Sequence, residues 1–255
     1  MASQQPESTE EGVNALFYAL SSNDRTRILS ALKEDELKLN DVVHRLDLTA
    51  TEAFRQLQRL TEASLIERKS NGKFRLTSYG KLVLESSSSL DFISKFKEYF
   101  RRHNAFVLPP ELRARLGELS GCRLVTSNTE TLNIVDEMIK SAEKRINATV
   151  FGLEVLLKKA RDRIGDGVEE RWLMQESYLV KAKGFLRSTK QLPEMRWTTS
   201  IPIEMFLTEK MAGVTLPLNG GVSSYYSFFG SEPRFLRWAD NLFDEEWQKA
   251  KIWHP

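Results

Sequence analysis

Cysteine, histidine and long apolar runs are what this 255-residue sequence has least of. The single cysteine, Cys122, cannot form a disulfide within the chain, which is typical of proteins from a reducing cytoplasm. With only His44, His103 and His254 beside that thiol, we predict neither a metal site nor another cofactor. No apolar run approaches the roughly 18 residues of a membrane helix. We therefore expect a cytoplasmic protein without metal or thiol chemistry.

Charge is nearly balanced over the whole chain, with 37 basic and 35 acidic side chains, but it is unevenly distributed. Residues 1–21 hold three acidic side chains and no basic one, whereas residues 22–104 hold 16 basic and 12 acidic side chains. A local excess of positive charge favours a polyanionic partner. Residues 1–11 are polar and acidic, so we expect a disordered tail there and not a signal or transit peptide.

A helix-turn-helix pattern follows this tail. Apolar spacing predicts helices over 39–46 and 50–63, separated by a tight turn at Asp47-Leu48. A preceding helix begins near Asn23 and is expected to turn Arg25 outward. Two helices joined by a turn of this length are typical of DNA-binding motifs.

A basic hairpin comes directly after the second helix of the motif. Runs 65–68 and 74–76 alternate apolar and polar residues, and Asn71-Gly72 lies between them. An Asn-Gly pair between two such runs is a strong hairpin signal. A helix-turn-helix followed by a basic hairpin is the winged-helix pattern, so we assign residues 12–77 to a winged-helix domain that binds double-stranded DNA.

The second helix of the motif is the expected recognition helix. Thr49 is its predicted N-cap, while Ala53, Phe54, Leu57 and Leu60 are expected to face inward. Arginine can bind guanine edges, glutamine can bind adenine edges, and basic side chains of the wing can contact phosphates. The predicted DNA-binding residues are Thr49, Thr51, Glu52, Arg55, Gln56, Gln58, Arg59, Arg68, Lys69, Asn71 and Lys73.

Residues 78–104 show helical spacing and form the expected helical linker, which we assign to dimerisation. The serine run 86–89 interrupts the apolar pattern, so this segment is either one long helix or two helices. The prolines at 109–110 end it. His103, at the end of the helix, is expected to be a cation at the negative end of the helix dipole.

Residues 105–255 alternate strand-like and helix-like runs, which predicts an α/β domain. The fold class is therefore α+β multidomain: a winged helix-turn-helix, a helical dimerisation linker and a C-terminal α/β domain. The expected strands lie at 122–125, 146–151, 167–174, 195–199, 203–208, 213–218 and 225–229, and the expected helices at 132–141, 154–164, 178–188 and 233–251.

Aromatic residues and methionines are concentrated in this second domain. Small-molecule pockets are mostly apolar with a few placed polar groups, so we predict an effector site there. The alternative is that most of these residues form the core and a dimer face. The predicted ligand-binding residues are Arg171, Trp172, Met174, Arg196, Trp197, Phe206 and Tyr225, with Gln175, Glu204 and Ser223 as further polar candidates.

We predict no catalytic residues. No histidine falls between residues 104 and 253, so a nucleophilic hydrolase lacks its usual base. No glycine loop of the phosphate-binding type is present either. Two alternatives to a DNA-binding regulator stay open: an adaptor whose winged helix binds a partner protein, and a phosphodiesterase that acts on nucleic acid through carboxylates.

The order of several short segments resembles the archaeal winged-helix transcriptional regulators whose effector domain is named after a methanogenesis regulatory protein. This resemblance implies a homodimer on a two-fold DNA operator, with an effector-sensing domain. It also implies a phospholipase-D-like fold without the catalytic His-x-Lys motif. The matching segments are Leu76-Thr-Ser-Tyr-Gly80, Glu98-Tyr-Phe-Arg-Arg-His103, Leu108-Pro-Pro-Glu111, Leu112-Arg-Ala-Arg-Leu-Gly-Glu-Leu119, and Arg237-Trp-Ala-Asp-Asn-Leu-Phe243 with Trp247.

Overall fold

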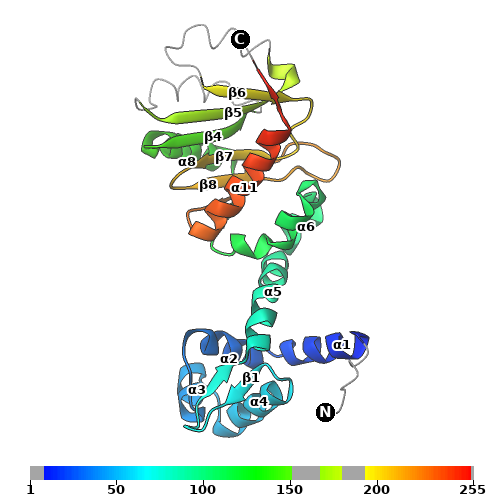
Figure 1. Cartoon of the computed structure of the whole chain (residues 1–255), viewed down its shortest axis with the longest axis vertical. Helices are drawn as coiled ribbons and strands as arrows, with labels where there is room; N and C mark the ends of the chain where they lie inside the picture. Colours follow the sequence, from blue (N-terminus) through cyan, green and yellow to red (C-terminus); the bar gives the residue numbers. More distant parts are fainter. Residues whose placement is uncertain (1–8, 151–166, 180–192, 254–255) are drawn as a thin grey trace, which may run out of the picture. The chain divides into compact units, whose positions relative to one another are not determined.

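The computed structural model describes residues 9–150, 167–179 and 193–253, and it divides the chain into two compact units, Met1–Ser87 and Ser88–Pro255 (Figure 1). The boundary falls within one helix, α5 (Ser78–Lys95). None of the helices in the described part of the chain is long and apolar enough to cross a membrane.

The N-terminal unit contains the predicted helix-turn-helix and hairpin. Helix α1 begins at Thr9, inside the segment expected to be a disordered tail. The two strands of the hairpin are antiparallel, and Phe74 also forms a β-bridge with Leu37. The elements of this unit before α5 are α1 (Thr9–Leu20), α2 (Asn23–Glu34), α3 (Leu39–Leu46), α4 (Ala50–Glu62), β1 (Ile66–Arg68) and β2 (Phe74–Leu76).

An apolar core joins all of these elements. Ile28 and Leu29 of α2, Val42 of α3 and Leu57 of α4 are buried in one cluster, which includes Phe74 of the hairpin. Helices α1 to α4 and the hairpin therefore bury apolar side chains together, as expected for a small helical domain.

Two predictions about this core are wrong. Arg25 is buried instead of outward, because its guanidinium donates to the carbonyls of Tyr18 and Ala19 at the end of α1. Phe54 is 57% exposed instead of inward, because the buried stripe of α4 runs through Ala53 and Leu57, and position 54 lies outside that stripe.

Helix α5 is continuous through the serine run, so the alternative with a break at the serines is wrong, although the segment 78–104 is not one helix throughout. It ends at Lys95, and α6 (Lys97–Arg102) follows after Phe96. The later part of this segment packs into the C-terminal unit: Phe92 and Tyr99 belong to its core. Short helices come next, namely η1 (Ala105–Val107), α7 (Pro110–Ala114) and η2 (Leu116–Leu119).

The C-terminal unit is built around an eight-stranded mixed sheet with the order β10-β6-β5-β4-β7-β8-β9-β3. Strands β4, β5 and β6 are parallel to one another, and the other neighbouring pairs are antiparallel. The strands are β3 (Arg123–Val125), β4 (Arg145–Val150), β5 (Glu169–Gln175), β6 (Glu194–Thr198), β7 (Glu204–Thr208), β8 (Ala212–Thr215), β9 (Ser227–Gly230) and β10 (Lys251–Ile252).

Helices cover both faces of this sheet (Figure 1). Helix α11 (Pro233–Lys249) packs Trp238 and Phe243 against one face, which includes Leu173. Helix α8 (Asn128–Ser141) packs Met138 against the other face, which includes Phe206. A short helix, η3 (Glu176–Tyr178), follows β5.

Most predicted strands of this domain are confirmed within a residue or two, and the predicted helices near α8 and α11 are also present. The helix predicted at 154–164 lies outside the described residues, and so does most of the one predicted at 178–188. Strand β10 was not predicted, because two residues are too few for an alternation pattern.

Candidate nucleic-acid interface

The turn and the start of α4 are built by local hydrogen bonds. Asp47 adopts a left-handed conformation with φ of 52° and ends α3. Thr49 is the N-cap of α4, as predicted, since its hydroxyl accepts from the backbone N–H of Glu52 at 3.2 Å. The Glu52 carboxylate in turn accepts from the backbone N–H and the hydroxyl of Thr49, which lowers the pKa of Glu52. In the described structure both side chains form a capping box.

The exposed face of α4 carries the remaining polar candidates. Arg55 and Arg59 are exposed, and among the described residues neither guanidinium has a hydrogen bond or ion pair. Gln58 donates to Glu62 at 3.0 Å. Thr51 is exposed on the first turn of the helix, and so is Phe54 on the next. Phe54 is the residue of this face that the sequence argument missed.

Gln56 does not belong to this face. It is buried, and its amide oxygen accepts from Arg25 Nη1 at 3.0 Å. The prediction that Gln56 points toward DNA is therefore corrected: this glutamine satisfies a buried cation, because a buried charged group needs a hydrogen-bond partner.

The wing is a tight hairpin. Gly72 has φ of +79°, a left-handed conformation that glycine adopts without strain, and its N–H donates to the Lys69 carbonyl. The side-chain oxygen of Asn71 accepts from the backbone N–H of Lys73 at 3.0 Å. Asn71 thus holds the turn in this structure.

The basic side chains of the wing differ in whether they form ion pairs within the described structure. Lys69 lies 3.1 Å from the Glu36 carboxylate, and Arg75 lies 2.6 Å from that of Glu67. Arg68 is exposed and lies over the ring of Phe74. Lys73 has no ion pair with any residue in the described ranges. Arg68 and Lys73 are therefore the wing cations free to meet an external anion.

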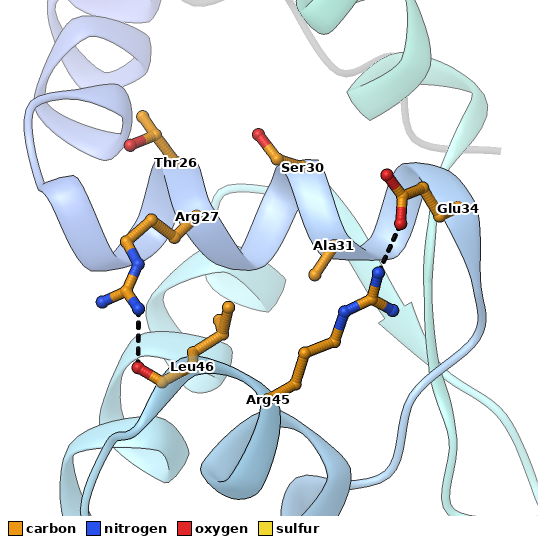
Figure 2. Close-up of a pocket in the computed structure, with 7 residues that line it drawn as sticks. All are labelled: Thr26, Arg27, Ser30, Ala31, Glu34, Arg45 and Leu46. Atoms are coloured by element: carbon orange, nitrogen blue, oxygen red, sulfur yellow. Dashed lines mark hydrogen bonds and ion pairs between the residues drawn. The ribbon is translucent and has the colours of Figure 1, made fainter.

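A groove of about 330 Å³ lies between α2 and α3 (Figure 2). Its two cations are held by neighbours: Arg27 donates to the Leu46 carbonyl at 2.7 Å, and Arg45 pairs with Glu34. Figure 2 shows both guanidinium groups directed at these partners. The groove thus lies between the first helix of the motif and the helix that precedes it, and both of its arginines are already engaged.

The predicted effector arginines lie beside α11. Arg171 pairs with Asp244 at 2.9 Å, donates to Asn147 and lies over the ring of Phe243. Arg196 donates to the Trp247 carbonyl at 3.0 Å and lies over the indole of that residue. Both side chains therefore hold α11 to the sheet in the described structure.

The apolar effector candidates are not gathered around one cavity. Trp172, Met174 and Phe206 are almost completely buried. The Trp197 ring lies 4.8 Å from Lys251 Nζ at the edge of the sheet, whereas Tyr225 is 63% exposed. The alternative interpretation, that these residues form the hydrophobic core, therefore accounts for Trp172, Met174 and Phe206.

A cavity of about 230 Å³ lies elsewhere in the C-terminal unit, and it brings together the three further polar candidates Gln175, Glu204 and Ser223. Residues that were not predicted complete it, and most of them come from segments between helices and strands, where no apolar periodicity singles them out. These other lining residues are Asn104, Val107, Ser200, Ile201, Pro202, Thr215, Leu216, Pro217, Gly221 and Ser224.

Hydrogen bonds organise the polar wall of this cavity. Ser223 donates to Glu204 at 2.7 Å, while burial raises the pKa of Glu204 above its ordinary value. The hydroxyl of Ser224 lies 2.7 Å from His103 Nε2, and His103 Nδ1 lies 2.8 Å from the Tyr99 carbonyl. Burial lowers the pKa of His103, so the prediction of a cationic helix end is wrong.

Comparisons with known proteins give two sequence likenesses. A family model described as the HVO_A0261 N-terminal domain matches residues 14–95. The methanogenesis regulatory protein FilR1 of Methanothrix harundinacea (strain 6Ac) is 30% identical over 135 residues, which is 50% of this chain and 30% of that protein. The chain therefore spans less than a third of this relative's length.

Solved structures give weaker likenesses. TrmBL2, described as an archaeal chromatin protein with a novel mode of DNA binding, is 15% identical with a TM-score of 0.41, over 96% of this chain and all of that one. NucT from Helicobacter pylori is 10% identical with a TM-score of 0.39, over 52% of this chain and 98% of that one. These comparisons do not support the phospholipase-D-like fold. The comparisons show that residues 14–95 are similar to the HVO_A0261 N-terminal domain, and that 50% of the chain is similar to part of a methanogenesis regulatory protein.

Proposed function

We propose that this protein is a DNA-binding transcriptional regulator that reads double-stranded DNA with α4 and the wing. The observation that carries the proposal is the exposed face of α4. Arg55 and Arg59 project from a helix that directly follows the turn of a helix-turn-helix, and both lack a partner among the described residues. Unengaged guanidinium groups on such a helix suit phosphate and guanine contacts in the major groove.

Each neighbouring side chain has a role in this proposal. Gln58 can bind adenine edges after leaving Glu62, and Phe54 can contact thymine methyl groups. Arg68 and Lys73 of the wing would contact phosphates, where they add affinity but little sequence preference. Thr49 and Glu52 act by holding the start of the helix.

The regulator is further proposed to be a cytoplasmic homodimer on a two-fold operator, with residues 12–77 binding DNA, residues 78–104 pairing the protomers and residues 105–255 sensing a small molecule. The name of the methanogenesis regulatory relative supports a regulatory role over an enzymatic one. An effector would act by changing the separation of two recognition helices, which must match half-sites about one helical turn apart.

The test is a salt series of binding to fragments of the protein's own upstream DNA against a scrambled duplex. We expect tighter binding to the genuine site, with affinity falling steeply as salt rises. Arg55→Ala and Arg59→Ala should each weaken specific binding by about 1–3 kcal/mol, or roughly 5- to 150-fold. Lys73→Ala should weaken binding to both duplexes alike and flatten the salt dependence.

Lys33→Ala is the matched control, because Lys33 is an exposed cation on α2, outside the proposed surface. It should leave specific binding unchanged. If Lys33→Ala costs as much as Arg55→Ala, the effect is one of net charge and the recognition face is wrongly assigned. Equal weak binding to both duplexes would overturn the DNA-reading role and favour the adaptor alternative. Metal-dependent cleavage of the duplex would favour the phosphodiesterase.

A further inference from the structure

The cavity of the C-terminal unit lies at one edge of the mixed sheet. Gln175 is the last residue of β5, and Thr215 is the last residue of β8. Glu204 is the first residue of β7, which runs antiparallel to β4, and it pairs with Thr215. These residues therefore meet outside the carboxyl ends of the parallel strands, where ligands bind in open α/β sheets.

The charge of the lining is one-sided. Among the described residues that line the cavity, Glu204 is the one charged side chain, and no lysine or arginine accompanies it. The other polar groups are neutral amides and hydroxyls, such as those of Asn104, Gln175 and Thr215. A phosphate or carboxylate ligand would meet a carboxylate and no cation there, so anions are disfavoured.

The Glu204 carboxylate is incompletely compensated. Ser223 donates one hydrogen bond to Oε1, and among the described residues no ion pair reaches either carboxylate oxygen. Burying a carboxylate is costly unless it is paired. The raised pKa of Glu204 has the same origin, since burial is its largest cause. A ligand that brings a positive charge would supply the missing partner.

We propose that this cavity binds a small organic amine whose ammonium group pairs with the Glu204 carboxylate. The neutral amide and hydroxyl groups that line the cavity would bind the hydroxyl groups or further N–H groups of the ligand. A volume of about 230 Å³ corresponds to roughly eight water molecules at about 30 Å³ each. The ligand is therefore an amine with on the order of ten non-hydrogen atoms or fewer.

Hydrogen bonds link the cavity to helix α6 and the residues directly after it. Ser224 binds His103 at 2.7 Å, and the backbone N–H of Leu216 donates to the Tyr99 hydroxyl at 3.1 Å. The backbone N–H of Asn104 donates to the Pro217 carbonyl at 2.8 Å. A ligand that moves the lining segments would thus act on the end of α6 through direct hydrogen bonds. This consequence rests on the proposed function, whereas amine binding itself does not.

The experiment compares matched pairs of small molecules on the full chain, without DNA. The first pair is 4-amino-1-butanol and 1,4-butanediol, and the second is 6-amino-1-hexanol and 1,6-hexanediol. We expect millimolar amine to raise Tm in a saturating manner and the paired diol to leave it unchanged. Glu204→Gln should lower amine affinity at least tenfold. Glu194→Gln, which removes an exposed carboxylate from β6, should change nothing.

Three results would overturn the proposal. They are no Tm difference between amine and diol in either pair, equal amine binding by Glu204→Gln, or equal losses in Glu204→Gln and Glu194→Gln. If Glu204→Gln fails to fold, Gln175→Ala tests the same cavity. It keeps the Glu204 carboxylate, and we expect it to weaken the binding of the two amino alcohols by a few fold. DNA binding of the ligand-free protein is measured separately. A failure of amine binding therefore leaves the regulator proposal standing, and a failure of DNA binding leaves the amine proposal standing.

Discussion

Arg25 holds three elements of the N-terminal unit together through one guanidinium group. Its Nε and Nη2 donate to the carbonyls of Ala19 and Tyr18, both at 2.6 Å, and its Nη1 donates to Gln56 of α4. The carbonyls at the end of a helix lack intrahelical partners, so a cation there also meets the negative end of the helix dipole. Arg25 thus fastens α1 and α4 to α2.

We predict that Arg25→Met lowers the free energy of unfolding by about 2–3 kcal/mol, since it leaves a buried glutamine and two carbonyls without their charged donor. Urea denaturation followed by circular dichroism measures this change. Arg59→Met is the matched control and should change stability by less than about 0.5 kcal/mol, because Arg59 is exposed. Equal effects of the two substitutions would contradict a fastening role.

His103 is the second residue with a consequence of its own. Its Nδ1 faces the Tyr99 carbonyl, so Nδ1 carries the proton and Nε2 accepts from the Ser224 hydroxyl. The ring also stacks on Tyr99, with centroids 3.7 Å apart. Burial of the ring is what favours the neutral imidazole in the folded unit, since it penalises the charged form.

The folded unit should therefore lose stability in mild acid. Burial lowers the pKa of His103 from its ordinary value of 6.5, so the unfolded chain takes up the proton first as pH falls. The stability that neutral His103 contributes is present above pH 6.5. It is lost progressively as the pH falls below 6.5, toward the pKa of His103 in the folded protein. Denaturation of the full chain between pH 7.5 and 5.5 should show this slope, and His103→Gln should reduce it. An unchanged slope in the variant would assign the effect to other groups.

At the scale of elements, local patterns predicted most of the structure. Alternation located the strands, and the turn at Asp47 with the cap at Thr49 located α4. The orientation of α4 was predicted less well. Gln56 is inward because it binds the buried Arg25, 31 residues away in the sequence, whereas Phe54 is outward because it lies outside the buried stripe of α4. A contact over such a separation leaves no trace in helical periodicity.

The cavity shows the same limit. Gln175, Glu204 and Ser223 were recognised as polar residues near apolar ones, but their meeting point depends on strand order. Strand β7 returns to pair with β4, which a sequence pattern does not reveal. Asn104 comes from the segment after α6 and reaches the cavity through its backbone hydrogen bond to Pro217. Hydrophobic periodicity identifies which side of a helix or strand is buried. The cavity depends on which helices and strands lie next to one another, which periodicity does not show.

At the scale of the whole molecule, α5 supports the proposed dimer. In its first part Tyr79 and Leu82 are exposed, and in its second part Leu90 and Ile93 are exposed. Each pair is separated by three residues, which places both members on one side of that part of the helix. Exposed apolar side chains clustered in this way mark interaction surfaces.

We predict that the chain is a dimer at micromolar concentration and that Leu82→Glu or Leu90→Glu shifts it toward monomer. A charge within an apolar interface would be buried without a partner. Light scattering coupled to size-exclusion chromatography measures the mass. Phe106→Glu is the control, because Phe106 is 80% exposed outside α5. Loss of the dimer in the control as well, or its retention in both α5 variants, would contradict pairing through this helix.

The outermost strands of the large sheet are unusually short. Strand β10 covers β6 with two residues, Lys251 and Ile252, and Trp253 N–H adds one bond to the Met195 carbonyl. Strand β3 forms the other border with three residues. Long open borders allow sheets of different molecules to join, and a lysine on a short border discourages this. The short, lysine-bearing border at β10 is therefore expected to disfavour pairing of this sheet with the sheet of another molecule.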